Sequence, residues 1–265
     1  MSYRATILGC GSSGGVPRIG ANWGACDPSN PRNRRWRCSA LIERIGKQRH
    51  TTVLIDSSPD VREQLLSVRC EAIDGVLYTH DHADHTHGID DLRMVSYAMK
   101  RRIDVWADDV TRKSLVDRFG YCFEKPAGSN YPPILNAHPI VPAVPIAVEG
   151  PSGVIEALPI QQLHGDIGSL AFRVGNFAYS PDVSEIPESS VPMLQGLDVW
   201  IVDALRFTAH PSHFSVKQAL AWVERLKPKR TILTHMTTDL DYEALRRELP
   251  AGVEPAYDGM VINFD

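Results

Sequence analysis

The stretch from Gly75 to His85 constrains this chain more than any other. It opens with an apolar run, 76–78, that has the length and the β-branched or aromatic character of a short buried strand. Alternate residues of an extended segment point the same way, so His80 and His82 converge on one metal ion. Asp84 and His85 lie where the chain turns into a helix, and they reach a second ion. Imidazole and carboxylate are ligands of Zn²⁺ and neighbouring first-row metals, so the sequence predicts a metal site at a strand end.

The second half of the chain repeats this arrangement with isolated residues. Short strand-like runs are each followed by one isolated side chain of a type that can bind a metal. The run 153–162 precedes His164, and a hairpin through Gly175-Asn176 precedes Asp182. Two apolar runs end at Asp203 and His235.

Hydrophobic periodicity predicts the remaining elements. Strands alternating with helices across two halves indicate sheets faced by helices, and we expect one domain over residues 1–265. Ser58 is the expected N-cap of a helix that begins at Pro59, and the segment 119–151 reads as a loop region that lines the substrate site. We expect further strands at 3–8, 38–45, 51–55, 103–106 and 260–264, and helices at 88–100, 109–119, 215–227 and 241–249.

Composition narrows the class of partner. The 265 residues carry a net charge of −4, which gives no overall basic surface and argues against a large nucleic acid as partner. The five cysteines follow no dense disulfide pattern, and no apolar segment long enough to be a signal peptide or membrane span is visible. We therefore expect a cytoplasmic protein with a small-molecule substrate and no membrane partner; a homodimer stays open.

Two segments near the N-terminus have both a functional and a structural interpretation. The glycine-rich turn with Ser12, Ser13, Gly14 and Gly15 follows the first strand, and its backbone N–H groups could bind phosphate. It could equally be a tight turn under the active site, and its spacing is not that of a dinucleotide-binding loop. The basic cluster Arg32, Arg34, Arg35 and Arg37 is either a solvated face or a phosphate clamp.

The run Thr79-His80-Asp81-His82-Ala83-Asp84-His85 resembles the T-H-x-H-x-D-H signature of the metallo-β-lactamase superfamily. This resemblance implies an α/β fold, the αββα four-layer sandwich, with two divalent metal ions. By carry-over, Asp56 supports the metal-binding loop and Asp182 bridges the ions. One ion would be held by His80, His82 and His164, and the other by Asp84, His85 and His235.

The segment His210-Pro211-Ser212-His213-Phe214-Ser215 is similar to the phosphodiesterase branch of that superfamily, which includes tRNA 3′-processing endonucleases and the PhnP phosphoribosyl cyclic phosphodiesterases. The resemblance implies that His213 donates a proton to the leaving oxygen, although His213 could also simply pack against a helix whose N-cap is Ser215. We assign His213 and Asp84 to the catalytic set. PhnP carries a structural zinc on loop cysteines, whereas here only Cys26 lies in that loop, so we expect no structural zinc.

These observations predict a phosphodiesterase that uses Mn²⁺ or Zn²⁺ to cleave a small cyclic phosphodiester or nucleotide. Asp182 stands where some drug-hydrolysing β-lactamases carry a cysteine, which argues against β-lactam hydrolysis. The alternatives are a tRNA 3′-processing endonuclease and a thioester hydrolase of the glyoxalase II type. A non-catalytic binding module is disfavoured because the ligand set is complete.

Overall fold

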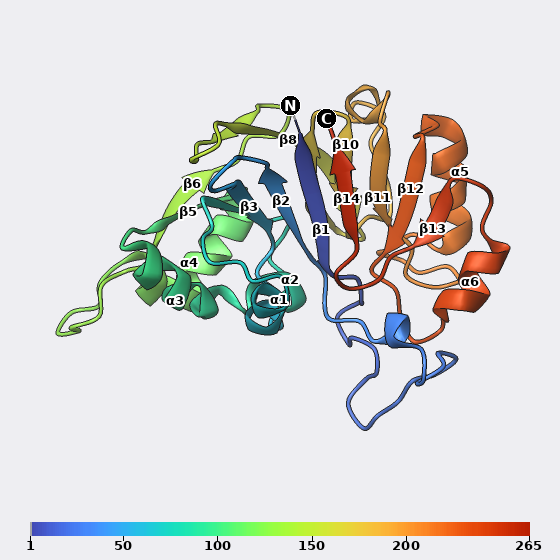
Figure 1. The fold of residues 1–265 in the computed structure, drawn as a ribbon, viewed down its shortest axis with the longest axis horizontal. Coiled ribbons are helices and arrows are strands. Elements are labelled where there is room, and N and C mark those ends of the chain that lie inside the picture. The colour runs from blue at the N-terminus through green and yellow to red at the C-terminus, as the bar shows by residue number, and fades with distance from the viewer. Residues whose placement is uncertain (1) are drawn as a thin grey trace.

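Two seven-stranded sheets pack against each other and carry helices on their outer faces (Figure 1). The computed structural model describes residues 2–265. The strand order is β14-β1-β2-β3-β4-β5-β6 in the first sheet and β13-β12-β11-β10-β9-β8-β7 in the second. The predicted αββα sandwich is confirmed.

The elements alternate along the chain. The first sheet contains β1 (Tyr3–Gly9), β2 (Ser39–Arg44), β3 (Thr51–Ile55), β4 (Gly75–Leu77), β5 (Ile103–Ala107), β6 (Leu135–Pro139) and β14 (Val261–Phe264). The second contains β7 (Ile146–Val148), β8 (Ile155–His164), β9 (Ile167–Val174), β10 (Phe177–Ser180), β11 (Val199–Asp203), β12 (Arg230–Thr234) and β13 (Val253–Pro255). The helices are α1 (Val61–Ser67), α2 (Ala83–Thr86), α3 (Leu92–Met99), α4 (Asp109–Phe123), α5 (Val216–Leu226) and α6 (Tyr242–Glu248), with short 3-10 turns at Pro31–Asn33, Ile89–Asp91 and Val191–Leu194.

The strands of the first sheet are apolar on both faces because each face meets a different core. In β3, Val53 and Ile55 belong to the central core between the sheets, whereas Leu54 belongs to an outer core beneath the helices. This alternation follows from the two-residue period of a strand. A one-residue slip would exchange the two faces, so burial on both sides fixes the register.

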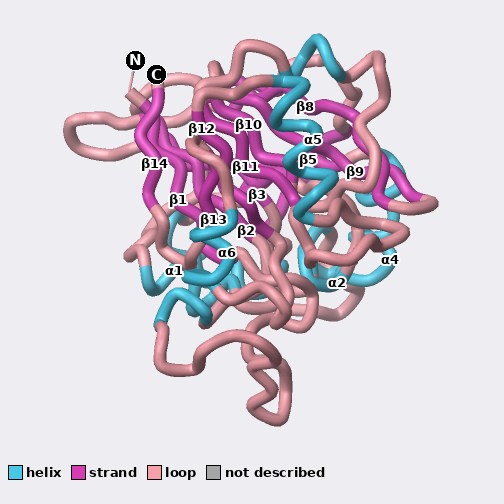
Figure 2. Tube along the Cα trace, turned by 90° about the vertical axis from the view of Figure 1, so that its right-hand side faces the viewer, coloured by secondary structure: helices cyan, strands magenta, loops and turns pink. Residues whose placement is uncertain are grey.

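The carboxyl ends of many strands meet at one edge of the sandwich. Strands β3, β4 and β5 are parallel, as are β10, β11 and β12. Figure 2 shows loops gathered below the strands at this edge. Side chains that follow strands far apart in sequence are therefore brought together here.

Several local predictions can be compared with the structure. The hairpins β2–β3 and β9–β10 are confirmed, the latter with Gly175 at φ +55°. Ser215 is confirmed as the N-cap of α5, with a reciprocal capping box to Gln218. The Ser58 cap is wrong: the helix begins at Val61, and the Ser58 hydroxyl accepts a bond from the Asp60 N–H. The segment 119–151 is less loop-like than expected, since it finishes α4 and contains β6 and β7.

Candidate metal centre

Seven histidine and aspartate side chains converge where the two sheets meet at the loop-bearing edge. They form overlapping groups whose ligand atoms lie within 4.8 Å of one another. One group is His80, His82 and His164, and another is Asp84, His85 and His235. A third group, His80, His85 and Asp182, connects them. The structure therefore brings together every side chain that the sequence nominated as a ligand.

The Asp182 carboxylate lies at the centre of this cluster. Its Oδ1 is 3.1 Å from His85 Nε2 and 3.1 Å from His235 Nδ1. Its Oδ2 is 3.9 Å from His80 Nε2 and 3.7 Å from His164 Nε2. Each carboxylate oxygen thus faces a different group of histidines, which is the arrangement expected of a carboxylate between two cations.

Three donor atoms of the cluster are suited to metal ions because they have no hydrogen-bond partner outside the cluster. His80 Nε2, His85 Nε2 and Asp182 Oδ1 are buried, and none forms a hydrogen bond within residues 2–265. A buried polar atom without a partner costs about 1–3 kcal/mol, so such atoms converging on one region need a ligand. Nitrogen and carboxylate oxygen are the donors that Zn²⁺ and Mn²⁺ accept.

Burial keeps several of these imidazoles in the neutral, metal-binding form. It lowers the pKa of His80 and His164, and it lowers the pKa of His235 to about 3. Burial also acts to lower the pKa of His85, but the carboxylates of Asp182, Asp84 and Asp56 raise it well above its ordinary value. The side of the cluster around His85 is therefore rich in negative charge that divalent cations would balance.

Asp56 holds the histidine loop in place. Its Oδ1 accepts a hydrogen bond of 2.8 Å from the Thr79 N–H, and its Oδ2 accepts one of 2.8 Å from the Thr79 hydroxyl. The same Oδ2 lies 2.7 Å from His85 Nδ1. This contact leaves His85 Nε2 facing Asp182, and it fixes the imidazole orientation as carboxylates around metal sites commonly do. Asp84, assigned to both ligand and catalytic sets, has its Oδ2 3.5 Å from His85 Nε2.

His213 lies beside the cluster and is paired with a carboxylate that the sequence analysis left without a role. Its Nδ1 is 2.7 Å from Asp203 Oδ2, and its ring stacks on that of His235 with centroids 4.7 Å apart. Burial raises the pKa of Asp203 to about 7. Burial acts in the opposite direction on His213, but the charge of Asp203 raises the pKa of the imidazole above its ordinary value. The pair therefore retains a proton near neutral pH. The sequence feature that could have identified Asp203 is its position at the end of a strand, where the candidate ligands also lie.

The glycine-rich turn begins next to the metal centre. The Ser12 N–H donates to the Met236 carbonyl, directly after His235, and Gly15 has φ +61°, which a glycine adopts without strain. Ser12 and Gly15 are buried, whereas Ser13 and Gly14 are exposed. Cys38 was also not predicted: its Sγ lies 3.3 Å from His235 Nδ1.

The basic cluster divides into residues with different environments. The Arg35 guanidinium is buried and donates to the Thr237 and Leu240 carbonyls at 3.1 and 2.7 Å. Arg37 is bound to Asp60, and Arg34 is exposed. Arg32 lies over the rings of two tyrosines. Neither of the two interpretations proposed from the sequence, a solvated face or a phosphate clamp, therefore describes all four arginines.

Comparison with known proteins agrees with this geometry. Residues 51–236 match the model of the β-lactamase superfamily domain. An octanoyltransferase of Porphyromonas gingivalis is 30% identical over 266 residues. The match includes 99% of this chain but only 52% of that protein, so the chain spans about half the length of this curated relative.

Solved structures extend the likeness over the whole chain. A structure described as a new diphosphatase from the PhnP family is 36% identical, with a TM-score of 0.89, and the match covers 100% of this chain and 98% of that one. The short form of human tRNase Z is 18% identical, with a TM-score of 0.67 and 98% of both chains covered. The second likeness concerns the fold alone. No helix within residues 2–265 has the length and apolar character needed to cross a membrane.

Proposed function

Because this chain belongs to the β-lactamase superfamily and has the metallo-β-lactamase hydrolase fold, we propose that it hydrolyses a phosphoric diester bond in a small cyclic phosphodiester or nucleotide. One observation carries the proposal: His213 lies beside the metal centre, within reach of His164 and Asp182 but outside the two groups of three ligands, and a buried carboxylate holds its Nδ1. Hydrolysis of a phosphodiester with an alcohol leaving group needs a proton donor of this kind, since an alkoxide leaves poorly.

Two divalent ions fit the residues present. His80, His82 and His164 would hold one ion, Asp84, His85 and His235 the other, and Asp182 would lie between them. Bound divalent ions lower the pKa of a water molecule toward neutrality and offset the charge of a phosphate. Both Mn²⁺ and Zn²⁺ suit this donor set, and we propose one of them as the native metal.

The Asp203–His213 pair supplies the proton. With its Nδ1 directed at Asp203 Oδ2, the imidazole has Nε2 free, since no group of residues 2–265 forms a hydrogen bond with that nitrogen. The protonated ring donates from Nε2 to the leaving oxygen as the ester bond breaks. Asp203 stabilises the protonated ring and fixes its orientation, which makes it a positioning residue.

A second candidate is cleavage of a diphosphate, and the observation that favours it is the 36% identity to a PhnP-family diphosphatase. Both reactions break a P–O bond and use the same metal ions and proton donor. The tRNA 3′-processing alternative is supported here by similarity of fold alone. Thioester hydrolysis leaves the Asp203–His213 pair without a purpose, because a thiolate leaves without a proton donor.

Substrate comparison on metal-restored protein tests the proposal. Metal-stripped protein, refilled with Mn²⁺ or Zn²⁺, is assayed with 2′,3′-cyclic AMP, ADP and a glutathione thioester. We expect metal-dependent turnover of the cyclic nucleotide. Turnover of ADP alone would replace the first candidate by the second, and turnover of the thioester alone would contradict both.

A further inference from the structure

We propose that Arg35 is a positioning residue for the metal centre, because its buried guanidinium fixes the loop that follows His235. Arg35 is not a candidate ligand, and it acts on the centre through the backbone of residues 236–240, which we call the ligand loop. The inference rests on the proposed function, since it concerns the binding of one of the two proposed ions. It assigns a role to the arginine of the basic cluster that is buried.

His235 has a backbone conformation that a histidine rarely adopts. Its φ is +59°, in the left-handed region, where a residue with a Cβ is strained. Strand β12 ends at Thr234, so the strand pairing of β12 does not extend to the ligand loop. A strained conformation persists only where the surrounding structure imposes it. The contacts of the ligand loop therefore determine whether the His235 imidazole stays beside the other ligands.

The Arg35 guanidinium binds two carbonyl groups of the ligand loop. Its terminal nitrogens donate to the Thr237 oxygen at 3.1 Å and to the Leu240 oxygen at 2.7 Å. The planar guanidinium presents its N–H groups in a fixed geometry, so it sets the distance between the two carbonyls. Arg35 is 1% exposed, and its third partner is the Cys26 sulfur. Burying a cation against uncharged partners is unfavourable, and an apolar side chain would serve packing alone as well. Arg35 is therefore suited to fixing the loop rather than to filling space.

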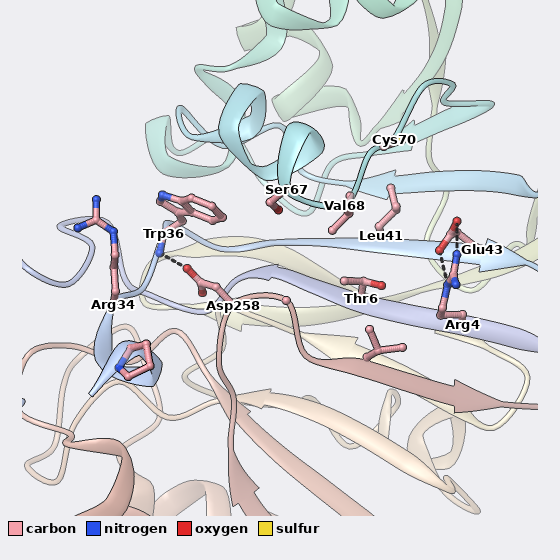
Figure 3. Close-up of a pocket in the computed structure, with 13 residues that line it drawn as sticks. Arg4, Thr6, Arg34, Trp36, Leu41, Glu43, Ser67, Val68, Cys70 and Asp258 are labelled. Atoms are coloured by element: carbon pink, nitrogen blue, oxygen red, sulfur yellow. Dashed lines mark hydrogen bonds and ion pairs between the residues drawn. The ribbon is translucent and has the colours of Figure 1, made fainter. Parts of the chain in front are cut away.

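The backbone around Arg35 is itself held by the rest of the fold. The Arg35 N–H donates to the Val16 carbonyl, and the Arg35 carbonyl accepts from the Val16 N–H, both at 2.9 Å. Figure 3 shows that the next residue, Trp36, donates its N–H to Asp258, and this hydrogen bond is 2.6 Å long. The same carboxyl group accepts a hydrogen bond of 3.0 Å from the Cys10 N–H. The Arg35 side chain therefore extends toward the ligand loop from a fixed base.

The two ends of the ligand loop are held in different ways. At its start, backbone hydrogen bonds with the glycine-rich loop and with the Leu205 carbonyl hold residues 236 and 237. At its end, two side chains bind the Leu240 carbonyl, Arg35 at 2.7 Å and Cys26 at 3.4 Å. Burial raises the pKa of Cys26, which keeps it a thiol, and a thiol is a weak donor. Arg35 is therefore the stronger of the two side-chain contacts at the end of the loop.

A shift of the ligand loop would affect one proposed ion more than the other. The group of ligands that contains His235 would lose an imidazole when the loop moves. The other group, His80, His82 and His164, lies on the loop after β4 and at the end of β8, and Arg35 forms no hydrogen bond with either segment within residues 2–265. Loss of the Arg35 guanidinium should therefore weaken the ion at His235 selectively.

Metal binding resolved by site tests the inference. Protein loaded with ¹¹³Cd²⁺ should give two NMR resonances, which His235→Ala and His82→Ala assign by removing one ligand from each group. In Arg35→Met we expect the resonance of the His235 site to weaken or disappear and the other to stay. Competition between the protein and a chelator for Zn²⁺ should show about 10–100-fold weaker binding of one ion. Removing a positive charge would by itself strengthen cation binding, so a weaker affinity reports the lost loop position. Arg35→Lys, which keeps the charge and can bind one carbonyl, should show a smaller loss.

The matched control is Arg173→Met. Arg173 also binds two carbonyls of one loop, those of Met193 and Gln195 at 2.7 and 2.9 Å, but that loop carries no candidate ligand. This variant should keep both resonances and the wild-type affinity for Zn²⁺. Thermal unfolding of the metal-free proteins should show that the variants fold, and Arg35→Lys carries the comparison if Arg35→Met does not. Unchanged affinity for both ions in the Arg35 variants, or an equal loss of both ions, would overturn the inference. A wild-type protein that binds fewer than two ions would instead reject the proposed metal centre, and the inference with it.

Discussion

The two halves of the molecule each fix one imidazole with a buried carboxylate that follows a strand. In the first half, Asp56 after β3 lies 2.7 Å from His85 Nδ1. In the second half, Asp203 at the end of β11 lies 2.7 Å from His213 Nδ1. Both carboxylates are fully buried. The local arrangement is nearly the same, and yet the two imidazoles have different surroundings.

The difference lies at the other ring nitrogen. His85 is completely buried, and its Nε2 faces the carboxylates of Asp84 and Asp182. The His213 side chain is 11% exposed, so a substrate can reach it. We therefore propose that the same carboxylate–imidazole pair orients a metal ligand where acidic groups enclose the ring, and a proton donor where the ring meets solvent.

We expect the largest loss of activity at Asp182, which lies between the two groups of ligands and belongs to neither carboxylate–imidazole pair. Asp182→Ala removes the carboxylate that faces His80, His85, His164 and His235. We expect activity to fall by about 10³-fold or more, because the proposed ions would supply both the nucleophile and the charge stabilisation. Elemental analysis should find fewer than two ions per chain. Full metal content with unchanged turnover would contradict the bridging role.

Asp203→Asn should affect chemistry and leave the metal in place. The amide cannot stabilise a protonated His213, so we expect kcat to fall by about 10–100-fold, part of the effect of a general acid. KM and metal content should stay near wild-type values. Asp117→Asn, at an exposed position of α4, is the matched control. A loss of metal from Asp203→Asn would show that the Asp203–His213 pair supports metal binding, as the Asp56–His85 pair is proposed to do.

Asp56→Asn should weaken metal binding and leave the chemical step largely intact. Its partner His85 is a proposed ligand, and residues that orient ligands typically contribute about 10–100-fold to metal affinity. We expect weaker binding of Zn²⁺ or Mn²⁺ in a chelator competition, with kcat largely restored at saturating metal. If kcat stays low at saturating metal while the affinity for metal is unchanged, Asp56 contributes to the chemical step. The two carboxylates, Asp56 and Asp203, would then not differ in role.

The sequence predicts the first half of the centre more completely than the second. Four candidate ligands between His80 and His85 follow one apolar run, so local spacing is enough to recognise them. His164, Asp182 and His235 are single residues, and only their order after strands, together with the family resemblance, makes them candidates. Asp182 and His235 converge because the parallel strands β10 and β12 end at one edge, whereas His164 ends β8, which is antiparallel to β9; both arrangements are properties of the fold.

The failures of prediction have the same origin. Asp203 received no role because its partner His213 is ten residues away on a loop, where no periodicity connects the two. The arginines near residue 35 read as one cluster, but the fold sends Arg35 into the interior to carbonyls of residues 237 and 240. Ser58 resembles a cap by type, although the backbone delays the helix to Val61. The first two errors concern tertiary contacts that local sequence does not encode, and the third concerns the residue at which the helix begins.

We propose that His213 protonates the leaving group, and the dependence of kcat on the leaving group tests this role. Metal-loaded wild-type protein and His213→Ala are compared on a 2′,3′-cyclic nucleotide, whose leaving alkoxide needs a proton, and on bis-(p-nitrophenyl) phosphate, whose leaving anion is stable without one. We expect kcat to fall by about 10²–10⁴-fold on the cyclic nucleotide and by much less on the p-nitrophenyl ester. Equal losses on both substrates, with metal content unchanged, would contradict the proton-donor role.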